Sequence, residues 1–249
     1  MAISYKSKSE IELMREAGRI LALTHDELAK RVKPGMTTLE VDRIGEEIIR
    51  SYGCIPSFLN YNGYPASVCV SVNDEVIHGI PSKAKILKEG DIVSVDTVAL
   101  KGGFNGDAAR TFIVGNVPKE TQRLVDVTKQ AFFEGIKYAK KGNRLGDISH
   151  AIGEYIENNN FSVVREFQGH GIGRQMHEEP GVPNYGKPGK GMRLEEGMTI
   201  AVEPMVIEKN PDILELEDGW TIVTEDGSLS AHYENTILIT ENEAKVLTI

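Results

Sequence analysis

Two acidic residues, Asp96 and Glu203, stand inside segments that otherwise have the composition of buried strands. Residues 87–97 read LKEGDIVSVDT and residues 194–204 read LEEGMTIAVEP, so Asp96 aligns with Glu203 at a separation of 107 positions, which is 194 minus 87. A carboxylate left alone on a covered strand is costly, because burial removes its hydration and supplies no partner. The repeat predicts that the two acids occupy equivalent places and that each requires a partner.

Two further acids and a histidine extend this pattern. Asp107 comes shortly before the apolar run TFIV at 111–114, and Glu234 comes shortly before TILI at 236–239. Four carboxylates brought together repel one another unless cations lie between them. His170, between glycines in QGHGIG, could add an imidazole. This donor set suits a pair of Mn²⁺, Fe²⁺ or Co²⁺ ions better than a closed structural zinc. Two such ions would bridge a water, lower its pKa and produce a nucleophile for hydrolysis.

Each of these residues also has an ordinary interpretation when it is taken alone. Asp107 fits a turn after Asn-Gly, and Glu234 fits a solvated strand face. Asp96 and Glu203 each fit an ion pair with an arginine, and His170 fits a loop. The joint pattern is what favours a metal site.

The other histidines divide into three groups. His78 in VIHGIP and His177 in MHEEP could donate hydrogen bonds to a substrate carbonyl or an oxyanion, although a single histidine more often has no site role. His25 and His150 fall in helical patterns and are predicted at the surface. His232 shares a strand face with the last of the four acids, which indicates a supporting role and disfavours a role as ligand.

Capping patterns and hydrophobic periodicity predict the elements that position these residues. A Ser-x-x-Glu pattern at 9–12 predicts the start of one helix, and Thr37 with Glu40 predicts the start of another. In the second half, residues 118–139 predict a long helix and IGEYI at 152–156 lies in a further helix. Strands are predicted at 67–72, 92–99, 110–114, 163–167, 199–205, 220–224 and 235–240, with a hairpin turn at 102–103.

The order helix, helix, strands therefore occurs twice. IGEEI at 44–48 returns as IGEYI at 152–156, which is 108 positions later (152 minus 44). Chance similarity between amphipathic helices is the alternative, and the matching acids weigh against it. Since no Gly/Ser-rich linker divides the chain, we expect one catalytic domain over residues 1–249, with related halves of about 1–116 and 117–249.

Composition excludes several classes of protein. The 249 residues are 40% hydrophobic and 26% charged, which is ordinary for a globular domain, and no run is long and apolar enough for a membrane span. The start of the chain lacks the apolar core of a signal peptide, so a cytoplasmic location is predicted. Two cysteines without a CxxC pair exclude a thiolate zinc finger, and the net charge of −9 argues against broad nucleic-acid binding.

The chain resembles the type I methionine aminopeptidases, in their short bacterial form. The resemblance covers nearly the whole chain and rests on the blocks NGYPASVCVSVNDEVIHGIP, VSVDTVALKGGFNGDAARTFIVG, GHGIGRQMHEEP, TIAVEP and SAHYENT. It implies an α+β pita-bread fold, in which two related halves of helices and antiparallel strands surround a metal site about a pseudo-two-fold axis.

The resemblance also implies roles for individual residues. Two divalent ions, from among Co²⁺, Mn²⁺, Fe²⁺ and Zn²⁺, would be bound by Asp96, Asp107, His170, Glu203 and Glu234. His78 and His177 would contact the substrate, and Glu203 would also move the proton. The methionine pocket would be lined by Tyr61, Tyr64, Cys69, Met176 and Trp220. Ordinary core packing is the alternative for these five. Asn62 and Met176 depart from the histidine and phenylalanine that many relatives carry at these places.

The implied reaction is removal of the N-terminal methionine from nascent proteins and peptides when the second residue is small. A bridging hydroxide on the dinuclear centre would attack the first peptide bond. The implied partners are nascent polypeptide N-termini and the ribosome, without a membrane or a specific nucleic acid, and the protein is expected to be a monomer.

Two alternative functions stay open. A proline-specific peptidase, such as a prolidase or aminopeptidase P, would have this fold but usually a large extra N-terminal domain. A non-catalytic binding protein that kept the fold should have lost at least one of the five ligands.

Overall fold

The part of the chain that the structure describes contains four α-helices and one short 3₁₀ turn. The structure is a computed structural model that describes residues 3–249. The helices are α1 Lys8–Arg31, α2 Thr38–Ser51, α3 Lys119–Ile136 and α4 Leu145–Asn158, and the 3₁₀ turn is Tyr61–Gly63. Among the described residues, no helix is both long and apolar enough to cross a membrane.

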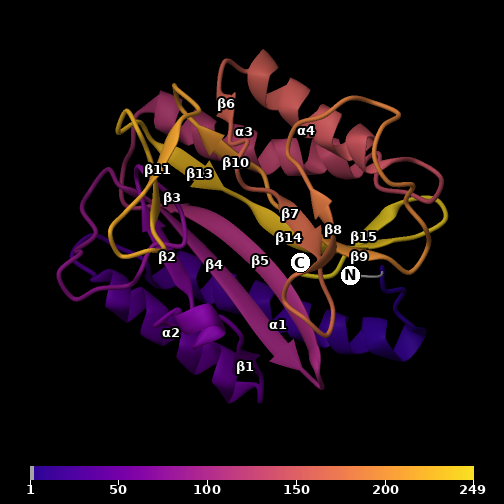
Figure 1. Ribbon diagram of the computed structural model, residues 1–249. Coiled ribbons are helices and arrows are strands. Elements are labelled where there is room, and N and C mark those ends of the chain that lie inside the picture. Colours follow the sequence, from indigo (N-terminus) through magenta and orange to yellow (C-terminus); the bar gives the residue numbers. More distant parts are fainter. Residues whose placement is uncertain (1–2) are drawn as a thin grey trace.

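Most of the strands belong to one antiparallel sheet of nine. Its order is β1-β4-β5-β14-β9-β7-β8, with β2 beside β4 and β15 beside β14. These nine strands are β1 Ile55–Pro56, β2 Cys69–Val72, β4 Ile92–Lys101, β5 Phe104–Ile113, β7 Gly169–Gly171, β8 Glu178–Val182, β9 Thr199–Val202, β14 Glu234–Ile239 and β15 Ala244–Val246. The long strands β4, β5 and β14 run side by side through the middle of the molecule (Figure 1).

Two smaller sheets of three strands each complete the fold. Their orders are β13-β10-β6 and β11-β12-β3. The strands are β3 Glu75–Ile77, β6 Ser162–Val163, β10 Met205–Ile207, β11 Ile213–Glu215, β12 Ile222–Thr224 and β13 Ser230–His232. The β11-β12-β3 sheet joins the two halves of the chain, because β3 comes from the first half and pairs with β12 from the second.

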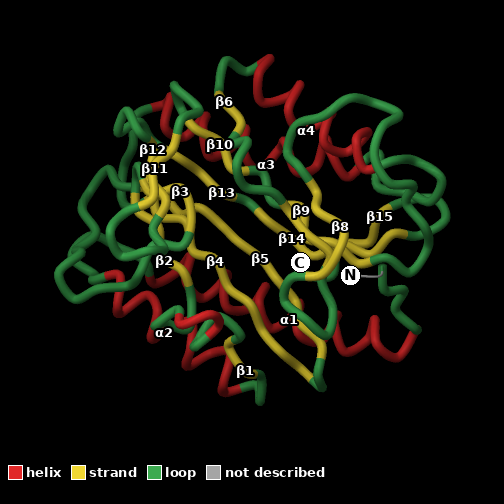
Figure 2. The backbone as a smooth tube through the Cα atoms, viewed as in Figure 1, coloured by secondary structure: helices red, strands yellow, loops and turns green. Residues whose placement is uncertain are grey.

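Each half of the large sheet is covered by its own pair of helices. In Figures 1 and 2, α1 and α2 run along one side of the central strands and α3 and α4 along the other. Leu21 of α1 is buried with Val93, Val95 and Ala108 in one hydrophobic cluster. A second cluster combines residues of α3 and α4 with residues of β9 and β14: Leu124, Phe132, Ile148, Ile152, Ile200, Val202 and Ile237. Burial of these apolar side chains is the main force that holds the helices on the sheet.

Local hydrogen bonds explain where the first two helices begin. Thr37 and Glu40 form the predicted capping box of α2. The capping prediction for α1 was wrong, because Ser7 and Glu10 form the box, two residues before the predicted Ser9. Both serines head a Ser-x-x-Glu pattern, so the sequence alone does not distinguish them. Lys6, directly before Ser7, is buried and donates its backbone N–H to the carbonyl oxygen of Gly197, which favours the earlier start.

Glycines allow α1 to lie close to two neighbouring segments, the C-terminal segment and β5. A Cβ added to Gly18 would lie 2.0 Å from the carbonyl oxygen of Leu247, and one added to Gly106 would lie 3.1 Å from the backbone nitrogen of Gly18. Backbone atoms cannot move aside as a flexible side chain can. Gly106 therefore lets α1 lie directly on β5, next to Asp107, and Gly18 lets the C-terminal segment approach the helix.

The predicted elements are recovered with shifts at their ends, and short strands were missed. The hairpin turn at 102–103 is present, and the two strands around it are longer than predicted. The strand predicted at 163–167 shrinks to β6, and the sequence reasoning did not find β1, β7, β8, β11 or β15. β4 and β9 lie on either side of the central pair β5–β14, which is the arrangement expected if the halves are related. The internal duplication itself stays a prediction.

Candidate active site

Strand register places three of the predicted residues on one face of the sheet. Asp96 pairs with Ala109 across β4 and β5, and Glu234 pairs with the same Ala109 across β14 and β5. Directly opposed residues in antiparallel strands point to the same face, and residues two apart on a strand do so as well. Asp107, two residues before Ala109, therefore joins Asp96 and Glu234 on this face. The small side chain of Ala109 leaves the space between the acids free.

The other half of the sheet supplies Glu203 and His170 to the same place. β9 pairs with β14 through Val202 and Asn235, so Glu203, the next residue, comes opposite Glu234. His170 is the centre of β7, the strand on the far side of β9. The acids predicted from the repeated segments thus converge from both halves of the chain.

Glycines on both sides of His170 allow β7 to fit between its neighbours. A Cβ on Gly169 would lie 2.3 Å from the carbonyl oxygen of Ala201, and one on Gly171 would lie 2.2 Å from that of Glu179. His170 is therefore held in a strand that tolerates no side chain before or after it. Its Nδ1 lies 2.8 Å from the carbonyl oxygen of Gly171, which accepts the Nδ1 proton. The Nε2 atom is then left with a lone pair, as in histidines that bind metals.

That Nε2 atom faces the acids. It lies 3.6 Å from Oε1 of Glu203 and 3.8 Å from Oδ2 of Asp107. Burial, with a smaller effect of His177, lowers the pKa of His170 to about 3, so the ring is neutral at physiological pH. A neutral imidazole can donate an electron pair to a metal ion but cannot neutralise the acids.

Burial and mutual repulsion disfavour the charged forms of the four carboxylates, and Arg110 acts in the opposite direction on Glu234 with a smaller effect. Burial raises the pKa of Asp96 to about 7. Burial, followed by the charges of Asp96 and Glu203, raises the pKa of Asp107 well above its usual range. Burial and neighbouring carboxylates have the same effect on the pKa of Glu203 and of Glu234. A bound cation reverses this direction, because it favours the charged form of each acid.

Unpaired buried atoms show that the site fits a metal. Asp96 Oδ1, Asp107 Oδ1 and Glu234 Oε1 are buried and have no hydrogen-bond partner. Such atoms are uncommon in proteins and require a specific explanation. One ligand atom from each of Asp107, His170 and Glu234 lies within 4.8 Å of the others, a spacing that could hold an ion.

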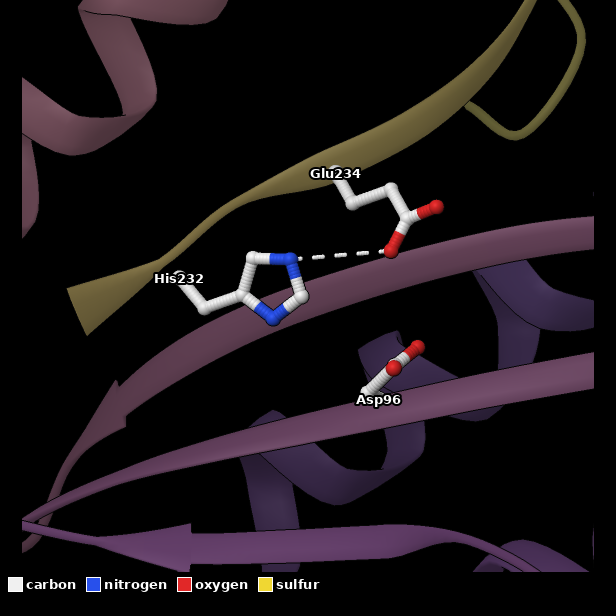
Figure 3. A group of neighbouring side chains, drawn as sticks. All are labelled: Asp96, His232 and Glu234. Atoms are coloured by element: carbon white, nitrogen blue, oxygen red, sulfur yellow. Dashed lines mark ion pairs between the residues drawn. The ribbon is translucent and has the colours of Figure 1, made fainter. Parts of the chain in front are cut away.

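A second group of the same kind contains His232. One ligand atom from each of Asp96, His232 and Glu234 lies within 4.8 Å of the others, and Figure 3 shows the three side chains together over the sheet. His232 Nε2 lies 3.6 Å from Glu234 Oε2 and 4.0 Å from Glu203 Oε2, and it has no hydrogen-bond partner. The sequence indicated only a supporting role for His232. Its position makes it a candidate ligand as well.

One cavity brings together the predicted metal ligands and the two predicted substrate histidines. It has a volume of about 340 Å³ and is lined by all five predicted ligands together with His78 and His177. Phe167 and Gln168 also line it, and sequence reasoning missed both. Gln168 is the first residue of QGHGIG and Phe167 directly precedes it, so their closeness in sequence to His170 was the available signal.

The two remaining site histidines lie at the opening to a second cavity. His78 adopts a left-handed backbone conformation, with φ of 59°, directly after β3. Burial, with a smaller effect of His177, lowers its pKa to about 4. His177 Nδ1 lies 2.8 Å from the Tyr61 hydroxyl, and burial lowers its pKa. When the tyrosine donates this bond, Nε2 of His177 carries the proton and can donate to a substrate.

The second cavity has a volume of about 240 Å³ and an aromatic wall. Four of the five predicted pocket residues line it, Met176 being the exception: the lining is Phe58, Tyr61, Asn62, Tyr64, Cys69, His78, His177 and Trp220. Met176 is buried in the hydrophobic cluster directly behind this wall. Phe58 lines both cavities and was missed, because the segment around it has no strong periodicity. Asp96 pairs with Cys69 across β4 and β2, which connects the pocket to the acids.

One of the two histidines predicted at the surface is buried. His25 is 4% exposed, and its Nε2 lies 3.0 Å from the carbonyl oxygen of Ala108. The prediction failed because His25 lies on the side of α1 that faces β5. The side chain of His150 is 38% exposed, as predicted.

Comparison with known proteins places the chain in a family. The model of metallopeptidase family M24 matches residues 12–241. This protein belongs to metallopeptidase family M24, because that match covers most of the chain. Membership in a metallopeptidase family implies the use of divalent metal, in agreement with the unpaired carboxylates.

Individual relatives within the family carry a more specific name. The chain is 52% identical to a methionine aminopeptidase of Clostridium acetobutylicum over 247 residues, 99% of both chains. It is 51% identical to methionine aminopeptidase 1 of Bacillus subtilis over 243 residues, 98% of both. The crystal structure of a methionine aminopeptidase from Thermotoga maritima superposes with a TM-score of 0.98 at 49% identity and covers 99% of both chains. These relatives confirm the resemblance and the predicted α+β pita-bread fold.

More distant structures share the fold alone. A prolidase from Pyrococcus furiosus superposes with a TM-score of 0.79 at 24% identity. The match covers 98% of this chain but 65% of the prolidase. That coverage agrees with the expectation that prolidases carry an additional domain.

Proposed function

We propose that this protein is a methionine aminopeptidase, which removes the N-terminal methionine from proteins and peptides whose second residue is small. The observation that carries the proposal is the convergence of four buried acids, three of them with an unpaired oxygen, and a neutral histidine in one cavity, beside an aromatic pocket. The methionine aminopeptidases named above support it, since they match along nearly their whole length.

The proposed metal ligands are those that the sequence predicted. They are Asp96, Asp107, His170, Glu203 and Glu234, which would hold two divalent ions of Co²⁺, Mn²⁺, Fe²⁺ or Zn²⁺. Four carboxylates offer enough negative charge for two divalent cations, and hard oxygen donors suit these metals. Bound divalent ions lower the pKa of a coordinated water and polarise a peptide carbonyl, which is the chemistry that amide hydrolysis requires.

The other roles belong to side chains that face the cavity. We assign Glu203 the transfer of a proton from the attacking water toward the leaving amine. His78 and His177 are neutral and face the same cavity, so they can donate hydrogen bonds to the scissile carbonyl as its oxygen becomes anionic. The pocket behind them would hold the methionine side chain, because a flexible thioether suits a wall of aromatics and sulfur.

The two alternative functions are less well supported. A proline-specific peptidase shares the fold, but the prolidase above resembles this chain in fold only. A non-catalytic binding protein would have no reason to keep four buried, mutually repelling acids beside His170, since each buried acid without a cation costs stability.

The proposed partners and location follow from this activity. The substrates are nascent polypeptide N-termini, which places the protein near the ribosome in the cytoplasm. We infer a monomer, because a single chain supplies every group in the proposed site. The whole chain acts as one catalytic domain in this proposal.

A panel of synthetic peptides read by mass spectrometry tests the proposal. With Mn²⁺ or Co²⁺ present, we expect removal of methionine from Met-Ala-Ser and Met-Gly-Met and little action on Met-Lys or Met-Phe peptides. A larger second residue would collide with the cavity wall near His78 and His177. An N-acetylated peptide should resist cleavage, because it lacks the free amine. Cleavage before proline, regardless of methionine at position one, would instead support the prolidase-like alternative.

A further inference from the structure

The loop between β7 and β8 carries His177 and is held from outside the site. Residues 172–177 connect the two strands. The side-chain amide of Asn105, at the start of β5, donates hydrogen bonds of 3.0 and 3.2 Å to the carbonyl oxygens of Gly173 and Arg174. These bonds hold the first half of the loop, but they do not reach His177.

The N-terminal segment holds the second half of the loop. Lys6 Nζ lies 2.7 Å from Oε2 of Glu178, the residue after His177, and the Ser4 hydroxyl donates to the same oxygen at 2.6 Å. The other oxygen, Oε1, accepts a hydrogen bond of 3.1 Å from the backbone N–H of Gln175. One carboxylate thus connects the N-terminal segment to both ends of the turn that contains His177.

The lysine is built into the fold at this place. Its side chain is 4% exposed, and its backbone N–H donates to the carbonyl oxygen of Gly197 at 2.8 Å. A Cβ added to Gly173 would lie 2.4 Å from Cε of Lys6 and 2.8 Å from Oε1 of Glu178. Glycine at 173 therefore leaves the space that the ion pair fills. A buried ion pair of this kind adds little net stability, but it fixes the positions of the two side chains. Removing one partner leaves the other as an unpaired buried charge, which is costly.

His177 is consequently fixed at two points. Its ring is held by the hydrogen bond of 2.8 Å to Tyr61 and lies 4.2 Å, centre to centre, from the ring of His170. Its backbone is held through Glu178, which also pairs with Gly171 across β8 and β7. Movement of Glu178 would displace His177 relative to the acids, and a displacement of about 1 Å can cost on the order of a hundredfold in rate.

We propose that Lys6 is a positioning residue for the reaction: its buried ion pair with Glu178 holds His177 at the distance from the metal ligands that catalysis requires. The role of His177 rests on the proposed function. The other part of the proposal, that the N-terminal segment orders the loop that carries His177, does not depend on which reaction the protein catalyses.

Two substitutions in the N-terminal segment test the proposal. Lys6→Met keeps the length of the side chain and removes its charge, whereas the control Lys8→Met removes a charge from an exposed position two residues later. We expect Lys6→Met to lower kcat/KM about tenfold or more with bound metal unchanged. We also expect faster hydrogen exchange of the backbone amides of residues 173–178. Lys8→Met should change neither quantity.

A double-mutant cycle separates positioning from a general loss of structure. If Lys6 acts through His177, Lys6→Met should cause almost no further loss of kcat/KM in a His177→Ala background. Independent, additive losses would overturn the proposal, as would an unchanged exchange rate in the loop. If Lys6→Met does not fold, Lys6→Gln supplies the same cycle; Glu178 itself lines the cavity, so a change there would alter the site directly. Loss of metal from the folded variant would also contradict the proposal.

Failure of the proposed function gives a different result. If the native protein, loaded with metal, cleaves none of the peptides of the panel, the proposed function is wrong. The exchange measurement still decides whether Lys6 orders the loop, because it requires no substrate.

Discussion

Asp96 and Glu234 lie in one row of the central sheet, and each is paired with the same residue, Ala109 of β5. The two acids come from opposite halves of the chain, and a methyl group is all that stands between them. A larger side chain at this position would fill the space that their carboxylates share. Ala109 therefore matters to the site because its side chain is small, although it takes no part in the chemistry.

We predict that Ala109→Leu lowers metal affinity by about 10- to 100-fold, in the range seen when residues that orient metal ligands are altered. Ala109→Ser is the matched control, because it keeps the space open. Isothermal titration of the metal-free variants with Mn²⁺ measures the difference. Equal affinity in both variants would contradict the geometry inferred from the row.

Loss of a carboxylate should have opposite effects on metal binding and on the stability of the metal-free protein. Asp107→Asn and Glu234→Ala are each expected to remove metal and activity together. In the metal-free protein, however, Asp107→Asn should raise the free energy of unfolding at neutral pH by roughly 1–4 kcal/mol. Burial and the neighbouring carboxylates raise the pKa of Asp107, so the folded protein must take up a proton there that the unfolded chain has released, whereas asparagine is neutral in both states. Denaturant titration in the presence of a chelator measures this gain. A destabilised metal-free variant would show that another group already balances the charge of Asp107.

His78 and His177 should separate catalysis from metal binding. Replacement of either by alanine should leave the metal bound and lower the turnover number, since a preorganised donor to a developing oxyanion contributes roughly 3–4 kcal/mol. Metal analysis of the purified variants, together with steady-state kinetics, tests both parts. Loss of metal in either variant would mean that the histidine is a ligand.

The buried His25 predicts a specific dependence of stability on pH. Burial, with a smaller effect of Arg110, lowers its pKa from the ordinary value of 6.5 to about 3, so the folded protein binds fewer protons than the unfolded chain between these values. Lowering the pH through this window therefore favours unfolding. Between pH 7.5 and pH 5, His25 should cost the native protein about 2 kcal/mol relative to a variant without the histidine.

His25→Gln is the suitable variant, because glutamine can still donate a hydrogen bond toward Ala108 but does not titrate. The comparison of unfolding free energies at pH 7.5 and pH 5 should be made with metal removed from both proteins, so that metal loss does not contribute. The stability advantage of the native protein over the variant should shrink as the pH falls. An advantage that is constant with pH would mean that His25 accepts a proton in the folded state.

Much of the site could be predicted from the sequence, because several of its residues differ in type from their immediate neighbours in the chain. The acids Asp96 and Glu203 were identified within segments of eleven residues, since an acid in an apolar run contrasts with its immediate neighbours. The capping box of Thr37 and Glu40 involves atoms only three residues apart. The five expected ligands line one cavity, although their binding of metal stays a proposal.

The tertiary structure alone decided which side chains are buried and which distant segments meet. His25 has a helical pattern like that of a surface residue, and only the packing of α1 on β5 buries it. His232 and Phe58 enter the site, and Lys6 reaches Glu178 across 172 positions of the chain. Such contacts between distant residues cannot be predicted from any short stretch of the sequence. They arise when the sheet register and the packing of helices on the sheet bring remote segments together, and both are set by burial of apolar surface over the whole chain.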